Sequence, residues 1–320
     1  MYKYIIICLY FMSLMFCISS NNMFIIWIFI EFNLMFYIPL YNKMNFSLSN
    51  SMMKYFIIQS ISSSMFLFFL LMNNNNINLF NLPLNMMLLI SMWIKMGFFP
   101  FSSWYFQMSE NLEWFMWFML NTLQKMIPLW VISMNMIQIK YLMFMLWINS
   151  IFSMIEIWNQ ISIRWIINSS SLNHFSWMIL NMTSKTNYWE TYFFIYFMIS
   201  LMLYMILMNN NWNSMLSMFN NKNSYLNILF SLNMMNMMGL PPFLGFFPKL
   251  MIIQTSNSIF MILMLTLNNI IISIIYLTLF LPLVSKTMKI NIINTQPNIK
   301  INISMMNLSL VFLMMFIYIL

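Results

Sequence analysis

The sequence predicts an all-α protein that crosses a membrane about eleven times and has no soluble domain. Of its 320 residues, 62% are hydrophobic and only 6% are charged, whereas soluble domains carry about 25% charged residues. Apolar stretches near the length that a bilayer requires, about 20 residues, follow one another along the whole chain. We therefore expect a single transmembrane helical bundle over residues 1–320.

Eleven apolar stretches separated by short, Asn-rich connections are the predicted spans. They cover residues 3–20, 22–41, 50–72, 82–105, 112–134, 140–158, 162–182, 187–208, 224–254, 258–284 and 304–320. The first stretch also resembles a signal peptide, because Lys3 precedes an apolar run that ends at Ser19-Ser20. A second full-length stretch follows at once, so we favour a retained first helix.

The basic residues of the connections predict the orientation, since such residues accumulate on the inner side of a membrane. With alternating connections, eight fall on the side of the N-terminus: Lys3, Lys43, Lys54, Arg164, Lys222, Lys286, Lys289 and Lys300. Lys140 and Lys185 fall on the other side. We expect most of these lysines to reach the membrane surface without a specific role, and we place the N-terminus on the positive-inside face.

The composition excludes several functions. A net charge of +8 could indicate a nucleic-acid partner, but the thirteen basic residues form no cluster. The chain has one histidine, no aspartate and two cysteines nine residues apart in one apolar stretch, so it cannot bind an iron–sulfur cluster alone. No phosphate-binding loop or nucleophile–base pair is present, so we expect no nucleotide, flavin, haem or metal on this chain. The abundance of methionine and the absence of alanine suggest a genome of biased composition, such as that of an organelle.

A helix break is predicted in the ninth stretch, which contains Gly239-Leu240-Pro241-Pro242-Phe243-Leu244-Gly245-Phe246-Phe247-Pro248-Lys249. Adjacent prolines remove two backbone donors and clash with the preceding turn. A bilayer does not tolerate exposed irregular backbone, so this break must lie inside protein or beside a polar cavity.

A second break is predicted at Gly97 and Pro100, next to Lys95. The chain has only three glycines, Gly97, Gly239 and Gly245, and all of them lie in these two lysine-bearing stretches. Two interrupted helices at corresponding places are typical of transporters built from inverted repeats, whose ion sites lie near the membrane midplane.

Six ionisable residues fall inside predicted spans: Glu31, Lys95, Lys125, Glu156, His174 and Lys249. A charge at the bilayer centre costs at least about 2.5–3.5 kcal/mol, so such residues indicate a functional site. Glu156 fits an interfacial place, and Lys249 could reach the membrane surface if its helix ends there. His174 fits a structural hydrogen-bonded histidine and a member of a proton relay equally well.

Four stretches in order resemble the family of NADH–ubiquinone oxidoreductase chain 2, a subunit of respiratory complex I. They are Gly239 to Lys249; Lys95-Met96-Gly97-Phe98-Phe99-Pro100-Phe101 with Trp104; Gln124-Lys125-Met126-Ile127-Pro128-Leu129; and Asn159-Gln160, Arg164 and Ser169 to Met178, including His174. The chain departs from the family's pattern at Leu123, Trp165 and Leu250. None of these departures touches a mid-span charge.

The resemblance implies an antiporter-like subunit of the complex I membrane arm with two interrupted helices, located in the mitochondrial inner membrane with its N-terminus in the matrix. Glu31, Lys95, Lys125 and Lys249 would form a central proton pathway, with His174 a link between Lys125 and Lys249. NADH, FMN, iron–sulfur clusters and ubiquinone are expected in other subunits, since this chain has no redox centre. The implied partners are other membrane-arm subunits, among them neighbouring antiporter-like ones, and membrane lipids.

In this reading Glu31 favours the protonated form of Lys95 when it is close, and its withdrawal releases a proton toward Lys125 and onward. Two alternatives stay open from the residues: a stand-alone cation/proton antiporter, and a structural membrane-arm subunit in which the charges serve helix packing.

Overall fold

The computed structural model describes most of the chain as α-helices. The described residues are 2–41, 46–74, 84–134, 139–158, 160–184, 188–210, 212, 214–219, 224–241, 243–256 and 258–293. The last predicted span, 304–320, lies outside them, and so do Lys43, Lys185, Lys222, Pro242 and Lys300.

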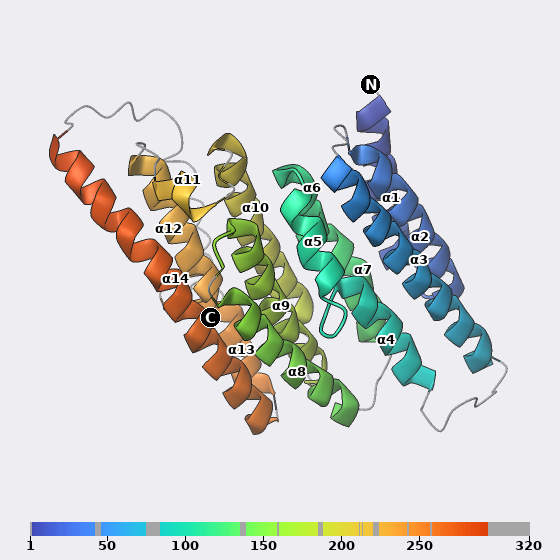
Figure 1. The fold of residues 1–320 in the computed structure, drawn as a ribbon. Coiled ribbons are helices and arrows are strands. Elements are labelled where there is room, and N and C mark those ends of the chain that lie inside the picture. The colour runs from blue at the N-terminus through green and yellow to red at the C-terminus, as the bar shows by residue number, and fades with distance from the viewer. Residues whose placement is uncertain are drawn as a thin grey trace. The chain divides into compact units, whose positions relative to one another are not determined.

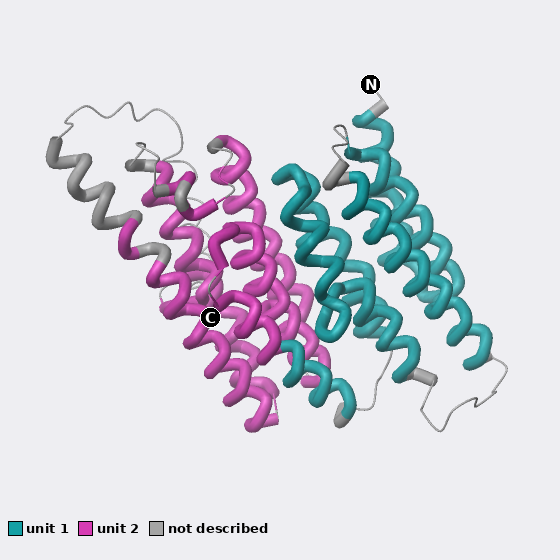
Figure 2. The backbone as a smooth tube through the Cα atoms, in the orientation of Figure 1, with its two compact units in different colours: residues 1–149 teal, residues 150–320 magenta. Residues whose placement is uncertain are grey.

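The chain divides into two compact units, residues 1–149 and 150–320 (Figure 2). The first unit contains α1 (Tyr2–Ser19), α2 (Met23–Tyr37), the 3-10 helix η1 (Ile38–Leu40), α3 (Phe46–Asn74), α4 (Leu84–Met96), α5 (Ser103–Asn111), α6 (Trp114–Asn121), α7 (Leu123–Met134) and the start of α8 (Ile139–Ile157). The second contains the end of α8, then α9 (Ile163–Met182), α10 (Trp189–Asn210), α11 (Met215–Phe219), α12 (Ser224–Met238), α13 (Phe246–Thr255) and α14 (Ile259–Ile293) (Figure 1).

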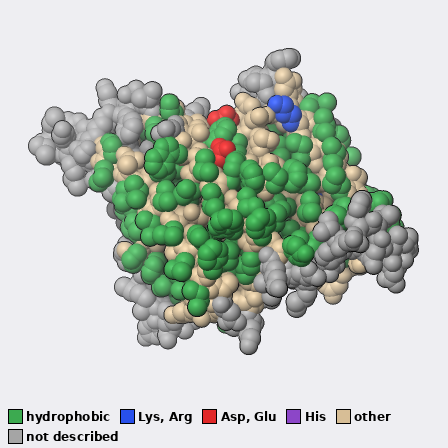
Figure 3. All heavy atoms as spheres, turned by 60° about the horizontal axis from the view of Figure 1, so that its bottom comes forward, with side chains coloured by type: hydrophobic (Ala, Val, Ile, Leu, Met, Phe, Trp, Pro, Cys, Tyr) green, Lys and Arg blue, Asp and Glu red, His purple; other side chains and the backbone are tan. Residues whose placement is uncertain are grey.

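Four helical segments of the described chain are long and apolar enough to cross a membrane: Met23–Leu40, Ser49–Asn73, Trp189–Asn209 and Ile259–Thr278. Shorter apolar helices cover Lys3–Ser19, Met86–Met96 and Tyr141–Ile157. The face drawn in Figure 3 is covered mostly by hydrophobic side chains, with few charged ones among them. This surface fits a hydrocarbon environment, where apolar side chains face lipid.

Three predicted spans do not form one continuous helix each. Residues 82–105 contain the end of α4 at Met96 and the start of α5 at Ser103, which continues to Asn111. Residues 112–134 contain α6 and α7, divided at Thr122. Residues 224–254 contain α12 and α13, separated by the stretch that begins at Gly239. The first and third divisions fall at the helix-breaking glycines and prolines, and they place irregular backbone inside each unit.

Aromatic side chains fill the core of the first unit where α2, α3 and α5 meet. Tyr55 packs between Tyr37, with ring centroids 5.4 Å apart, and Trp104, at 5.8 Å. The Tyr37 hydroxyl donates to the main-chain oxygen of Met116 at 3.0 Å, which fixes α6 against α2. Of these side chains, Tyr55 also lines the polar cavity of this unit.

Candidate functional site

The end of α4 is built by Gly97. Its φ of +68° is the left-handed conformation that glycine adopts at little cost. Its N–H donates to the main-chain oxygen of Ile94 at 3.1 Å, and the N–H of Phe98 donates to that of Trp93 at 3.3 Å. This pair of bonds is a Schellman motif. It ends the helix at Met96 and leaves the carbonyl of Lys95 available to another partner.

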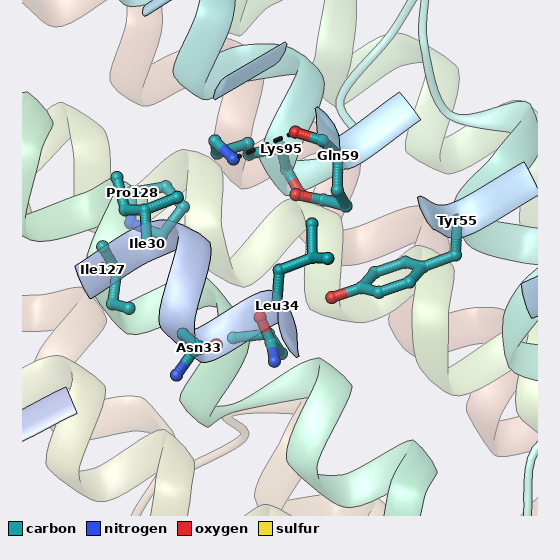
Figure 4. Close-up of a pocket in the computed structure, with 9 residues that line it drawn as sticks. Ile30, Asn33, Leu34, Tyr55, Gln59, Lys95, Ile127 and Pro128 are labelled. Atoms are coloured by element: carbon teal, nitrogen blue, oxygen red, sulfur yellow. Dashed lines mark hydrogen bonds between the residues drawn. The ribbon is translucent and has the colours of Figure 1, made fainter. Parts of the chain in front are cut away.

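Gln59 of α3 supplies that partner. Its side-chain Nε2 donates to the main-chain oxygen of Lys95 at 3.2 Å, while Lys95 Nζ donates to the main-chain oxygen of Gln59 at 3.3 Å (Figure 4). Both side chains are buried. The negative end of the α4 dipole also lies at this turn and favours a cation there. Lys95 is therefore held by a main-chain oxygen as well as by the helix dipole.

Glu31 lies on α2, half-buried and close enough to interact electrostatically with Lys95. The two side chains form no direct ion pair, and the ammonium instead bonds the carbonyl of Gln59. An acid that is close but not in contact can change the protonation of Lys95 through small movements of either helix. Glu31 and Lys95 are therefore close neighbours in the structure, without a direct bond between them.

A cavity of about 20 Å³ opens beside Lys95. Its walls are Ile30, Asn33, Leu34, Tyr55, Gln59, Lys95, Gln124, Ile127 and Pro128, several of them polar (Figure 4). This volume exceeds the roughly 10–15 Å³ that one water molecule needs, and a buried water also needs two to four polar partners. The Nε2 of Gln124 is buried with no hydrogen-bond partner. The cavity can therefore hold water between Lys95 and the residue next to Lys125.

Lys125 lies near the start of α7 and is also buried. Its Nζ stands 4.0 Å from the centroid of the Tyr105 ring, a cation–π contact. The Tyr105 hydroxyl donates to Oδ1 of Asn121, which fixes the ring. Pro128 lies inside α7 and has no N–H for the carbonyl of Gln124 four residues earlier. Lys125 thus has an aromatic face and a locally weakened helix beside it.

The second unit contains a break of related construction after α12. Gly239 has φ +70°, and its N–H lies 3.2 Å from the main-chain oxygens of both Met235 and Asn236. Gly245 packs so closely on this turn that an added Cβ would lie 1.9 Å from the Asn236 oxygen. The break therefore needs both glycines, one for its conformation and one for its close packing.

Lys249 of α13 reaches back to this helix end. Its Nζ donates to the main-chain oxygen of Met238 at 2.8 Å and to Oδ1 of Asn269, on α14, at 3.2 Å. Asn173 of α9 donates to the same Oδ1 at 2.7 Å. Lys249 is buried and α13 continues past it to Thr255, so its ammonium is directed at protein oxygens and not at the membrane surface.

His174 of α9 bonds the same helix end as Lys249. Its Nε2 lies 3.0 Å from the main-chain oxygen of Met237, and its Nδ1 lies 2.9 Å from the hydroxyl of Tyr192 on α10. Lys249 and His174 therefore bind adjacent carbonyls, those of Met238 and Met237, and they interact electrostatically.

The structure thus groups the candidate residues by unit. Glu31, Lys95 and Lys125 lie in the first unit, and His174 and Lys249 lie in the second. Glu156 accepts a 2.9 Å hydrogen bond from Nε1 of Trp165. In the part of the chain that the structure describes, no group of three or more His, Cys, Asp or Glu side chains could hold a metal ion.

Sequence reasoning missed three polar partners of these sites: Gln59, Tyr192 and Asn269. A polar side chain inside an apolar span was the available signal for Gln59. Asn269 was hidden by the abundance of asparagine in this chain, and nothing marked Tyr192 among fifteen tyrosines.

A family model, relatives of known sequence and solved structures all resemble this chain. A family model described as NADH:quinone oxidoreductase/Mrp antiporter, transmembrane, matches residues 20–275. NADH-ubiquinone oxidoreductase chain 2 of Anopheles gambiae is 34% identical over 263 residues, which are 78% of this chain and 76% of the relative. The chain 2 of Rhipicephalus sanguineus is 32% identical over 305 residues, or 92% of this chain and 94% of the relative.

Solved structures show the same fold at low sequence identity. A chain of respiratory complex I from Thermus thermophilus aligns with a TM-score of 0.79 at 14% identity, covering 90% of this chain and 76% of that chain. A chain of an archaeal membrane-bound sulfane sulfur reductase aligns at 0.81 and 15% identity, covering 98% and 72%. A chain of the Mrp complex from Dietzia aligns at 0.68 and 12% identity, covering 89% and 59%.

Proposed function

Because the chain belongs to the family of NADH-ubiquinone oxidoreductase chain 2, we propose that it is a core subunit of the complex I membrane arm. It takes part in proton translocation that is coupled to electron transfer from NADH to ubiquinone. Its partners are other membrane-arm subunits, including neighbouring antiporter-like ones, and lipids. NADH, FMN, iron–sulfur clusters and ubiquinone belong to other subunits of this enzyme.

The membrane arrangement that we propose has eleven spans. Helices α4 and α5 together make one interrupted span, and α12 and α13 make another. Helices α6 and α7 make a further span that is divided at Thr122. The charge of the connections favours an N-terminus in the matrix of the mitochondrion. The four long apolar segments support a multi-pass protein.

The proton pathway that we propose runs through Glu31, Lys95, Lys125, His174 and Lys249. The observation that carries it is the pairing of a buried lysine with a main-chain oxygen beside each of two helix breaks. Lys95, near the end of α4, donates to Gln59 of α3, and Lys249 donates to Met238 at the end of α12. Such oxygens accept a hydrogen bond from an ammonium but cannot take its proton. The lysine is therefore oriented without being neutralised, and an acid such as Glu31 can still control its protonation.

A cycle follows from these contacts. When Glu31 is close to Lys95, its carboxylate favours the ammonium, and when it moves away the buried ammonium loses that support. The proton then leaves toward the cavity beside Gln124 and toward Lys125. His174 and Lys249 come after Lys125 in the order that the family resemblance implies.

Replacing Lys95 or Lys125 with methionine tests this function. Each variant keeps a long apolar side chain and removes the titratable group, so we expect assembled complex I to translocate protons about tenfold more slowly or worse. Lys54→Met is the matched control, because Lys54 is exposed and bonds Gln107 at the surface. Near-normal pumping by both buried-lysine variants, in normally assembled complex, would contradict the pathway.

The alternative is a cation/proton antiporter of the Mrp type, which the matched family model also describes. A complex I subunit should purify only within a very large assembly that oxidises NADH. An antiporter should catalyse cation/proton exchange without NADH in vesicles that lack the other complex I subunits. A purely structural subunit predicts that the methionine variants reduce assembly but leave the proton stoichiometry of the assembled complex unchanged.

A further inference from the structure

The two ring nitrogens of His174 face different chemistry. Nε2 lies 3.0 Å from the main-chain oxygen of Met237, and Nδ1 lies 2.9 Å from the Tyr192 hydroxyl. A carbonyl oxygen only accepts, so Nε2 carries its hydrogen in both the neutral and the charged ring. Nδ1 is therefore the nitrogen whose protonation changes, and the hydroxyl of Tyr192 is its partner.

We propose that Tyr192 is the proton-transfer residue of His174, and that each proton which His174 gains or loses passes through the Tyr192 hydroxyl. The proposal rests on the function proposed above. It adds Tyr192 to the pathway. The search for charged residues inside the predicted spans did not find this residue, because tyrosine is neutral and common in this chain.

Among the residues that the structure describes, Tyr192 supplies the hydroxyl that bonds His174. Both side chains are buried, and the two rings meet edge to face with centroids 6.0 Å apart. Tyr196, one turn along α10, packs its ring on the imidazole with centroids 5.4 Å apart. Lys249 of α13 interacts with the ring through its charge, α12 presents the Met237 carbonyl, and Tyr276 of α14 interacts with Tyr196.

The transfer conserves protons and leaves Tyr192 neutral at both ends. In the resting state the Tyr192 O–H donates to the unprotonated Nδ1. On loading, that O–H bond breaks as the N–H bond at Nδ1 forms, and the phenol oxygen takes a proton from a protonated water molecule. The product is an imidazolium whose Nδ1–H donates to Tyr192, and unloading reverses each bond change.

Loading His174 acts on Lys249 through charge. An imidazolium and an ammonium that bind adjacent carbonyls of one helix end repel each other in a medium of low dielectric. The proton that arrives through Tyr192 therefore favours release of the Lys249 proton. This coupling explains why a histidine is held with one fixed and one exchangeable nitrogen beside a lysine.

The test compares Tyr192→Phe with Tyr196→Phe in assembled complex I reconstituted into proteoliposomes. Both changes remove one hydroxyl from a ring that contacts His174, but only the first removes the partner of Nδ1. We expect Tyr192→Phe to slow proton translocation ~10-fold or more, to a rate similar to that of His174→Gln, and Tyr196→Phe to stay within about twofold of the parent, as expected of a group outside the transfer. Adding Tyr192→Phe to His174→Gln should cause little further loss, since residues of one relay are not additive.

Near-normal translocation in Tyr192→Phe, or equal losses in the two Phe variants, would overturn the proposal. Normal pumping by His174→Gln would also overturn it, while leaving the lysine pathway to the Lys95 and Lys125 variants. Should Tyr192→Phe not assemble, Tyr192→His keeps a group that can gain one proton while it loses another, whereas the amide of Tyr192→Gln only forms hydrogen bonds. We therefore expect Tyr192→His to pump faster than Tyr192→Gln. The reverse order would count against a relay.

Discussion

Gln59 and Lys95 each donate a hydrogen bond to the main-chain oxygen of the other, at 3.2 and 3.3 Å. The exchange joins the middle of α3 to the end of α4, next to the cavity and within electrostatic range of Glu31. The amide side chain of Gln59 thus supplies the hydrogen-bond donor that the Lys95 carbonyl lacks within the Gly97 turn. The position of a candidate proton carrier depends on a neutral residue of another helix.

Replacing Gln59 with leucine should destabilise this helix end. The change leaves the Lys95 carbonyl buried without its donor, which costs about 1–3 kcal/mol. We expect faster thermal inactivation of proton pumping and a lower yield of assembled complex. Ser64→Ala, on an exposed position of the same helix that bonds only its own backbone, is the control. Equal stability of the two variants would show that the Gln59 bond contributes nothing.

Alanine at Gly97 should disturb the site more strongly than any surface change. The left-handed conformation costs roughly 1–2 kcal/mol for a residue with a Cβ, and the new Cβ would lie 2.7 Å from Cβ of Tyr105. Tyr105 also covers Lys125, so both lysines of the first unit should be affected. The expected result is loss of assembled, pumping complex on native gels.

Ser103→Ala is the control for Gly97→Ala, because Ser103 is an exposed residue just beyond the same break. Full assembly and pumping of Gly97→Ala would mean that the turn can rebuild without the left-handed residue.

The contact of Lys125 with Tyr105 predicts a graded series. Tyr105→Phe keeps the aromatic face under the ammonium but loses the bond to Asn121, while Tyr105→Leu removes both. A buried cation–π contact contributes up to about 2 kcal/mol, so we expect the leucine variant to pump more slowly than the phenylalanine variant. The comparison uses initial rates of proton uptake by proteoliposomes. Identical rates would indicate that the ring serves Lys125 only by packing.

The sequence predicted the helix ends at Gly97 and Gly239 and the burial of Lys95, Lys125 and Lys249, because glycine and an intramembrane charge are marked by residue type. Gly97 and Gly239 follow the last residues of α4 and α12, whereas Pro128 and Pro282 lie inside α7 and α14. A lysine inside a 20-residue apolar stretch is unusual in any context. The partners could not be predicted, since Gln59 with Lys95 and Asn269 with Lys249 are brought together by packing between helices. Within residues 82–105, the hydrophobic pattern also could not show that one helix ends at Met96 and the next begins at Ser103. Apolar residues continue through the break between them.

Asn269 provides the last prediction, at the site of Lys249. Its Oδ1 accepts from Lys249 and from Asn173, so Asn269→Leu removes one of the two oxygens that hold the ammonium and leaves Asn173 without an acceptor. Asn269→Asp instead places a carboxylate beside the buried ammonium of Lys249. The negative charge favours the protonated form of the lysine, so Lys249 holds its proton more strongly. We expect both variants to slow translocation, the leucine variant by misplacing Lys249 and the aspartate variant by delaying proton release.

The two causes can be separated by pH. Raising the pH inside the proteoliposomes, where protons are released, promotes proton release and should restore part of the rate of Asn269→Asp, but not that of Asn269→Leu. Asn268→Leu is the matched control, since the Nδ2 of this buried neighbour has no hydrogen-bond partner to lose. A loss in Asn268→Leu as large as that in Asn269→Leu would mean that α14 tolerates no change here, and that Asn269 has no specific effect on Lys249.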